Sequence, residues 1–384
     1  MNAMSTIRQV FDADRHVTEP LTIWRHYLGA QHQQHLPYMA EIVTADDGGQ
    51  PVERAPMLFV DGQSIMNIST TARRIILEAA KLRHAEILDS QSPAGHLRQM
   101  DQDGIRCAAL FPTYASYLVS VDTMSAELSC EYARAYNDWL HDFCRHTPER
   151  LIGIGLLSRH DPQWMVKEAI RVAGFGWKTI VMRPNLVKGQ SLGSPAYNTF
   201  WATCAELGLA VVIHEGTHVR LPAVGTDRYQ SRFAMHACSH PMEQMMAFLS
   251  LLEGGVLERH PGLKFAFLEA GCGWLPYWLW RLDELEYKHL RAEVANNVRM
   301  LPSEYFKRQC YIGIEPTEPL LAEVVAHIGA EHILFGTDYP HVDHEQSILD
   351  AMMTGGGQLA AADHARIMYG NAMAFYQQPA GNTA

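Results

Sequence analysis

The chain has 384 residues, of which 47% are hydrophobic and 19% charged, and its formal net charge is −11. This is an ordinary globular composition, and an acidic surface repels nucleic acid and anionic membranes, so neither is an expected partner. The seven cysteines are scattered without a C-x-x-C pair, which argues against a disulfide framework and a cysteine zinc site. We expect a cytoplasmic protein, since neither a signal peptide nor a membrane-spanning run is recognisable.

Short apolar runs typical of β-strands alternate with helical patterns along the chain. The first run covers residues 8–16, and further runs cover 106–113, 150–158, 178–185, 209–216, 263–271, 309–316 and 332–340. Helical patterns follow at 125–146, from about Asp161, at 195–207 and from near His240. Such alternation predicts parallel βαβ units, and eight units predict a closed (β/α)8 TIM barrel. Residues 1–384 are therefore expected to form one α/β domain.

A long segment, residues 21–105, interrupts this alternation after the first strand. It contains the pattern LTIWRHYLGA, a Gly/Asp-rich turn at 46–49 and a helical stretch at about 70–84. An insertion after a barrel strand lies at the C-terminal face, where active sites are built, so we expect a cap or lid. The alternative is a packing insertion that plays no part in catalysis.

Ionisable side chains end several of the expected strands, where barrel enzymes place their catalytic groups. Asp14 and His16 lie on one side of the first strand, because side chains two apart share a face. His214 ends the fifth strand and Asp338 follows the eighth. Two imidazoles and two carboxylates suit one divalent metal ion, Zn²⁺ or Mn²⁺. Taken singly, each residue could instead be a solvated strand end or a core residue.

Other residues are candidates for catalysis. Glu269 ends the sixth strand, and alternation puts it on one face with Phe265 and Phe267, so it could enter the site as a general acid or base. It could equally cap a helix or bind an arginine. His240, just before Pro241 at the expected helix start, could reach the pocket or support a helix cap.

Substrate contacts have weaker candidates. Arg183, after the fourth strand, could clamp a substrate carboxylate through two parallel hydrogen bonds. The sequence does not rank it against three arginines of the insertion, Arg54, Arg73 and Arg74. His341 and Asp343 follow Asp338 and are expected at the mouth of the pocket.

Several motifs together resemble a known family. DADRHVTEP followed by LTIW, then VVIHEG, ERHPGLKFAFLEAG, ILFGTDYPH and GNAMAFY are similar to the amidohydrolase-related metal enzymes, in the same order and over nearly the whole chain. That family includes aminocarboxymuconate-semialdehyde decarboxylase and the resorcylate, vanillate and salicylate-type decarboxylases. The resemblance implies that Asp14, His16, His214 and Asp338 fill the ligand places, and that Glu19 supports His16 or contacts the substrate. It also implies a homodimer.

One position departs from the family pattern. The sixth strand of these decarboxylases typically ends in a proton-transfer histidine before a glycine pair, and this chain has Glu269 there. The resemblance favours non-oxidative decarboxylation of a small aromatic or enol-type carboxylate. The glutamate leaves open a hydrolase of C–C, C–N or C–O bonds, in which Glu269 or Asp338 takes a proton from a metal-bound water. A non-catalytic metal-binding protein is a third alternative.

Overall fold

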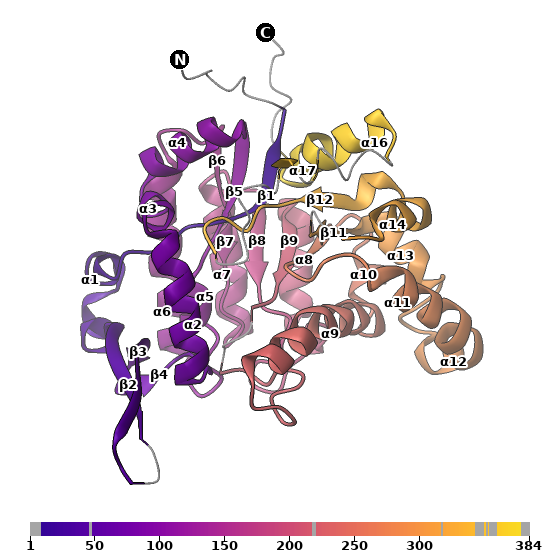
Figure 1. Cartoon of the computed structure of the whole chain (residues 1–384). Coiled ribbons are helices and arrows are strands. Elements are labelled where there is room, and N and C mark those ends of the chain that lie inside the picture. The colour runs from indigo at the N-terminus through magenta and orange to yellow at the C-terminus, as the bar shows by residue number, and fades with distance from the viewer. Residues whose placement is uncertain are drawn as a thin grey trace, which may run out of the picture.

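The computed structural model describes residues 9–45, 48–216, 220–315, 318–341, 349–350, 352 and 359–377. Its centre is built from parallel strands, which Figure 1 shows surrounded by helices. The strands are β1 (Phe11–His16), β5 (Cys107–Phe111), β6 (Leu151–Gly153), β7 (Gly155–Leu156), β8 (Thr179–Met182), β9 (Ala210–His214), β10 (Phe265–Leu268), β11 (Cys310–Ile314) and β12 (Ile333–Phe335). They overlap all the runs expected from the sequence and confirm an α/β fold with parallel sheets.

The parallel strands form two sheets that approach each other at both margins. Their orders are β1-β5-β6 and β12-β11-β10-β9-β8-β7. Only Ile154 separates β6 from β7 along the chain. At the other margin, the segment after β12 lies against β1, where the His16 amide donates to the carbonyl oxygen of Tyr339 at 2.7 Å. An isolated parallel bridge joins Arg15 to Tyr339 beside it.

Helices follow the strands and cover their outer faces. The longer ones are α6 (Ala126–Cys144), α7 (Pro162–Gly174), α8 (Asn198–Leu207), α9 (Arg232–Glu253), α13 (Pro302–Gln309) and α14 (Leu321–Ile328). Shorter ones are α5 (Tyr114–Leu118), α10 (Val256–Arg259), α11 (Leu275–Arg281), α12 (Lys288–Val294), α16 (Ala361–Ala365) and α17 (Asn371–Phe375). Side-chain caps fix two predicted starts, since Ser125 and Asp161 accept backbone N–H groups of α6 and α7.

The start of α9 corrects the sequence prediction. The helix begins at Arg232 and not near His240, because the Ser231 side chain accepts the Ala234 amide at 3.2 Å and caps it there. Pro241 therefore lies inside the helix, where a proline removes one backbone hydrogen bond without ending α9. His240 is consequently carried on a helix face two turns from the N-terminus.

The inserted segment has its own small sheet. An antiparallel sheet of β2 (Tyr38–Ala45), β3 (Pro51–Val60) and β4 (Gln63–Ser64) is flanked by α1 (Thr22–Tyr27), α2 (Thr70–Leu82), α3 (His84–Asp89) and α4 (Pro93–Asp103). In Figure 1 the β2–β3 hairpin projects at the lower left, away from the parallel strands. Of the expected turn at 46–49, residues 46 and 47 lie outside the described residues.

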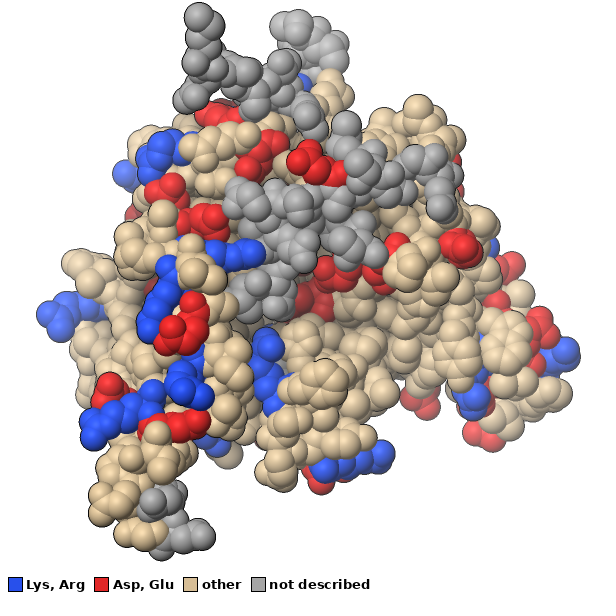
Figure 2. All heavy atoms as spheres, viewed as in Figure 1, with Lys and Arg blue, Asp and Glu red and all other residues tan. Residues whose placement is uncertain are grey.

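Charged side chains of both signs are mixed on the face of the molecule shown in Figure 2. Figure 2 shows Lys and Arg interspersed with Asp and Glu over α2 to α4 and around α12, without a continuous basic patch on this face. Within the described ranges, no helix has the length and apolar character needed to cross a bilayer.

Candidate metal centre and active-site pocket

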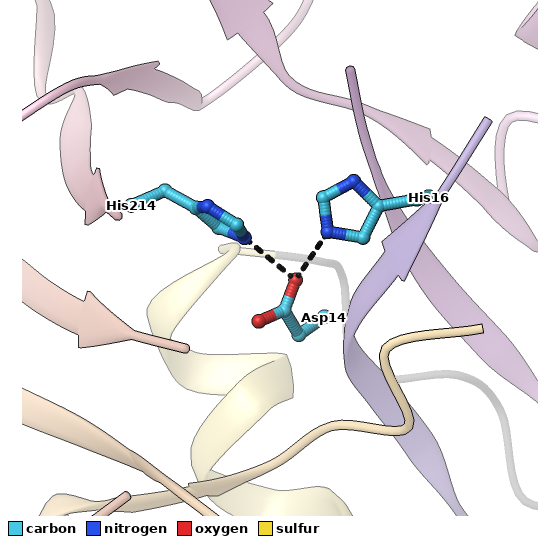
Figure 3. A group of neighbouring side chains, drawn as sticks. All are labelled: Asp14, His16 and His214. Carbon is cyan, nitrogen blue, oxygen red and sulfur yellow. Dashed lines mark hydrogen bonds and ion pairs between the residues drawn. The ribbon is translucent and has the colours of Figure 1, made fainter. Parts of the chain in front are cut away.

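Asp14, His16 and His214 meet at the ends of β1 and β9. Figure 3 shows the Asp14 carboxylate pointing between the two imidazoles. Its Oδ1 lies 3.4 Å from His16 Nε2 and 3.2 Å from His214 Nε2. All three residues are buried, and one donor atom from each lies within 4.8 Å of the others. This geometry brings together three of the four ligands that the sequence predicts.

The two imidazoles are oriented by contacts on their far sides. His16 Nδ1 lies 3.0 Å from the carbonyl oxygen of Pro112, so its proton belongs there and Nε2 presents a lone pair to the site. That Nε2 is buried and has no hydrogen-bond partner. His214 Nδ1 likewise lies 2.8 Å from the Glu215 carbonyl oxygen. An unpartnered buried nitrogen facing carboxylates is costly unless a cation binds it, so the donor set fits a divalent metal.

Asp338 and His341 complete a second, overlapping group around His16. Asp338 Oδ1 lies 3.2 Å from His16 Nε2 and 2.8 Å from His341 Nδ1. The His341 ring lies 4.1 Å from the His16 ring, and its Nε2 is 3.0 Å from Thr113 Oγ1. His16, Asp338 and His341 therefore also form a possible metal-binding group. Asp343, expected beside them, lies outside the described residues.

The turn after β12 is packed tightly on β1. The amides of Thr337 and Asp338 donate to the Asp14 carbonyl oxygen at 3.2 and 2.9 Å. A Cβ added to Gly336 would lie 2.5 Å from the Asp14 Cβ, so no larger residue fits without displacing that strand. Asp338 itself adopts a left-handed φ of 51°, which is uncommon for a residue with a side chain.

Glu269 reaches the site by a route different from the predicted one. Phe267 packs against Phe248 and Phe306 in the helix layer, whereas Leu268 is the register partner of His214. Strand alternation would therefore turn residue 269 toward the helices. The strand ends at Leu268, and a left-handed φ of 59° at Glu269 redirects the carboxylate inward.

The Glu269 carboxylate lies between two histidines. Its Oε2 is 3.2 Å from His214 Nδ1 and its Oε1 is 3.7 Å from His240 Nε2. Although burial opposes it, the charge of His214 and the hydrogen bond from His240 hold the pKa of Glu269 well below its usual range. The glutamate is therefore an ionised partner of both imidazoles.

The metal-free cluster favours a positive charge between its carboxylates. Burial lowers the pKa of His214, but the Asp14 and Glu269 carboxylates outweigh it and raise that pKa to about 9. Burial raises the pKa of Asp14, yet His214 and His16 bring it down to about 2. A divalent cation supplies the same positive charge while leaving the imidazoles neutral.

The predicted substrate contacts separate in the structure. Glu19 is buried and accepts the amides of Thr113, Tyr114 and Ala115 at 3.2, 2.8 and 3.1 Å, next to Pro112, whose carbonyl orients His16. Burial raises the pKa of the Glu19 carboxyl to about 7, although the three backbone hydrogen bonds act to lower it. Within the described residues, Glu19 lines neither of the two cavities at the metal site.

The arginines can be ranked by position. Arg183 lines the cavity beside His214 and donates to the Gly216 carbonyl oxygen, and its Nη2 lies 3.5 Å from Glu215 Oε1. Arg73 is buried, lines the same cavity and donates to the Pro56 carbonyl oxygen at 2.9 Å. The other two, Arg54 and Arg74, are exposed and paired with glutamates on the hairpin.

A cavity of about 310 Å³ connects these elements. The metal-site residues His16, His214 and Asp338 form part of its wall, and Arg73, Arg183 and Arg232 contribute positive charge. The remaining wall is largely apolar or aromatic and includes Met66, Ile76, Leu77, Ala80, Ile87, Tyr114 and Tyr117. The pocket thus suits a small anion with an apolar body.

A buried network behind Asp14 was missed by sequence reasoning. Asp12, placed on the same face as Asp14 by alternation, instead accepts the Thr337 hydroxyl at 2.6 Å and pairs with Arg15 at 3.3 Å. Arg15 also donates to His96 Nδ1 at 3.1 Å. Burial raises the pKa of Asp12 to about 6, although Arg15 opposes it. A register shift in β1 between Asp12 and Arg15 separates the two aspartates, and no sequence signal marks it.

Curated relatives with sequence similarity are decarboxylases. 2-Amino-3-carboxymuconate-6-semialdehyde decarboxylase of Dictyostelium discoideum is 28% identical over 212 residues, which cover 55% of this chain and 56% of that protein, so the match spans little more than half of that relative. Gamma-resorcylate decarboxylase of Rhizobium sp. (strain MTP-10005) is 26% identical over 319 residues, which cover 77% of this chain and 90% of that protein.

Solved structures share the fold. An amidohydrolase from Mycobacterium avium subsp. paratuberculosis superposes with a TM-score of 0.74 at 20% identity, covering 97% of this chain and 100% of that one. A 5-carboxyvanillate decarboxylase from Novosphingobium aromaticivorans, complexed with manganese, superposes with a TM-score of 0.69 at 18% identity. The match covers 98% of this chain and 97% of that one. The model of the amidohydrolase family matches residues 31–378. The chain therefore belongs to the amidohydrolase family.

Proposed function

We propose that this protein is a metal-dependent, non-oxidative decarboxylase of a small aromatic or enol-type carboxylate. The observation that carries the proposal is the buried Nε2 of His16, which has no hydrogen-bond partner and lies 3.4 and 3.2 Å from the Asp14 and Asp338 carboxylates, beside a cavity that His16 and Asp338 line. The decarboxylases among its relatives supply the reaction class.

The proposal includes a closed (β/α)8 barrel capped by residues 21–105. The adjacency of β6 and β7 and the backbone contacts of β1 with the segment after β12 support closure of the two sheets. Support for the cap comes from Met66, Arg73 and Ile76, which belong to the insertion and line the cavity.

We propose that Asp14, His16, His214 and Asp338 hold one divalent metal ion, Zn²⁺ or Mn²⁺. Manganese is present in the related carboxyvanillate decarboxylase. When bound, the metal withdraws electron density from substrate oxygens and stabilises negative charge.

The remaining candidate side chains have proposed roles in substrate binding or in proton transfer. Arg183 and His341 would contact the oxygens of the substrate. Glu19 would not contact the substrate but would hold residues 113–115 in place by accepting their amides. Protonation of the substrate carbon forms a C–H bond, the C–C bond to the carboxylate breaks, and CO₂ leaves. His240 is the proposed proton donor, because Glu269 is ionised and lies 3.7 Å from its Nε2. Glu269 orients this histidine and His214 together.

The experiment is a CO₂-release screen with the Mn²⁺-loaded protein. Hydroxybenzoates and carboxylated enols are supplied, and Asp14→Ala is the control that removes one ligand. We expect CO₂ with at least one compound for the wild type and none for Asp14→Ala. The proposal fails if a compound is consumed without CO₂, which is the result expected of the hydrolase alternative. A protein that binds stoichiometric metal and turns over nothing would support the non-catalytic alternative.

A cytoplasmic location and a homodimer stay predictions. The cysteines are free thiols, which suits a reducing compartment.

A further inference from the structure

A second cavity lies on the other side of the metal site. It has a volume of about 320 Å³ and is lined by α9 and by residues at the ends of β10, β11 and β12. His236, His240, Glu269 and Asp338 line both cavities. These four residues therefore lie where the proposed substrate pocket and the second cavity adjoin.

Two histidines of this wall are stacked. His236 and His240 lie four residues apart on α9, and their ring centroids are 3.9 Å apart with an interplanar angle of 22°. His240 is buried at 6% exposure, whereas His236 is partly exposed. The stack thus joins a partly exposed imidazole, His236, to a buried one, His240, whose Nε2 lies 3.7 Å from Glu269 Oε1.

The proposed reaction requires a proton supply. Each turnover converts a carboxylate and one proton into CO₂ and a C–H bond, so a donor that has given its proton must regain it from water. His236 is the more exposed of the two stacked imidazoles and lines the second cavity, so water there can supply a proton to His236 while the substrate occupies the pocket beside His240.

We propose that His236 is a proton-relay residue that reprotonates His240 from water in the second cavity. The inference rests on the proposed decarboxylase function. His240 transfers its proton to the substrate carbon and becomes neutral. Protonated His236 then returns a proton to His240 and is itself reprotonated by water or a buffer acid, so one proton is consumed for each CO₂ released. His236 acts through His240 and does not need to touch the substrate.

The charges around the stack suit a relay of positive charge. The same two cavities are lined by the carboxylates of Glu215, Glu269, Glu315 and Asp338 and by the guanidiniums of Arg183 and Arg232. Both cavities have carboxylates that attract protons, whereas among the described residues the arginines line the substrate pocket and not the second cavity.

The first test is His236→Gln in the Mn²⁺-loaded enzyme, assayed on the compound that the wild type decarboxylates. We expect kcat to fall about tenfold or more with KM nearly unchanged, because proton transfer by a positioned group contributes factors of this size. Added imidazole should restore kcat in proportion to its concentration. The matched control is His289→Gln on exposed α12, which should behave as wild type. Unchanged kcat, or a loss that imidazole does not restore, would overturn the relay.

The second test needs no turnover and separates the relay from the decarboxylase proposal. Nitrogen-15 NMR of labelled histidines follows the ring signals of both imidazoles with pH in the Zn²⁺-loaded protein, because paramagnetic Mn²⁺ would broaden them. A shared proton predicts that His236→Gln changes the pH dependence of the His240 ring signals. An identical His240 curve in both proteins contradicts the relay, whatever the enzyme decarboxylates, whereas absence of CO₂ release together with coupled titration would contradict only the decarboxylase.

Discussion

Glu19 makes the stability of the fold depend on pH in a way that can be measured. Its carboxyl group is buried at 1% exposure, and burial raises its pKa from 4.5 to about 7 despite three backbone N–H donors. Because the raised pKa favours the protonated form in the folded state, its contribution is fully present below pH 4.5 and is lost as pH rises through about 7. The shift corresponds to about 3 kcal/mol, of which about 2–3 kcal/mol is lost between pH 5 and 8.

The perturbation is Glu19→Gln, which cannot ionise. An amide NH₂ would face at least one of the three backbone donors, so the variant carries a cost of about 1–3 kcal/mol at every pH. That constant cost cancels when stability is compared across pH. We therefore expect the wild type to lose about 2–3 kcal/mol relative to the variant between pH 5 and 8.

The assay is urea unfolding of both proteins, without metal, at several pH values in this range. All other titrating groups are common to the two proteins, so the difference in free energy of unfolding isolates residue 19. Parallel curves would refute the reasoning, since they would mean that the backbone donors keep Glu19 ionised throughout.

The metal site and its neighbouring turn yield further predictions. The pKa of His214 is about 9 without metal, so binding of Mn²⁺ at neutral pH should release about one proton from this imidazole. The affinity for Mn²⁺ should then rise about tenfold per pH unit up to about pH 9. Calorimetry in buffers of different ionisation enthalpy measures the number of protons released. Asp338→Asn should keep the fold by circular dichroism but lower Mn²⁺ affinity at least about tenfold in a competition titration. Gly336→Ala should cost about 1–3 kcal/mol in denaturant unfolding and weaken Mn²⁺ binding, because its Cβ would meet Asp14 at 2.5 Å. Gly174→Ala, which meets nothing within 4 Å, is its neutral control.

The strands were predictable because their signal is local. Runs such as AVVIH and FAFL are continuous apolar segments bounded by turn residues, as expected for parallel strands buried on both faces. His214 could be placed at a strand end on this basis, and its approach to Asp14 followed from parallel topology.

Other features depend on contacts that a single sequence does not display. The α9 start was set by Ser231 and not by Pro241, so His236 was never recognised as lying one turn before His240 on the same helix. The spacing of four residues between His236 and His240 is visible in the sequence. It predicts that the two rings meet only if both residues are known to lie within one helix. Similarly, Asp12 and Asp14 looked equivalent until the irregular β1 register directed one to Arg15 and the other to the metal site.

Among the described residues, three acidic residues have a left-handed backbone, and two of them, Glu269 and Asp338, lie at the candidate site. Glu269 directly follows the last residue of β10 and turns its carboxylate toward His214. Asp338 comes three residues after the last residue of β12 and turns its carboxylate toward His16. A left-handed conformation costs a residue with a Cβ about 1–2 kcal/mol relative to the usual backbone. Glycine would avoid this cost but would remove the carboxylate. The chain thus keeps strained backbone where each carboxylate is turned toward a histidine, which is consistent with the roles proposed for Glu269 and Asp338 in the site.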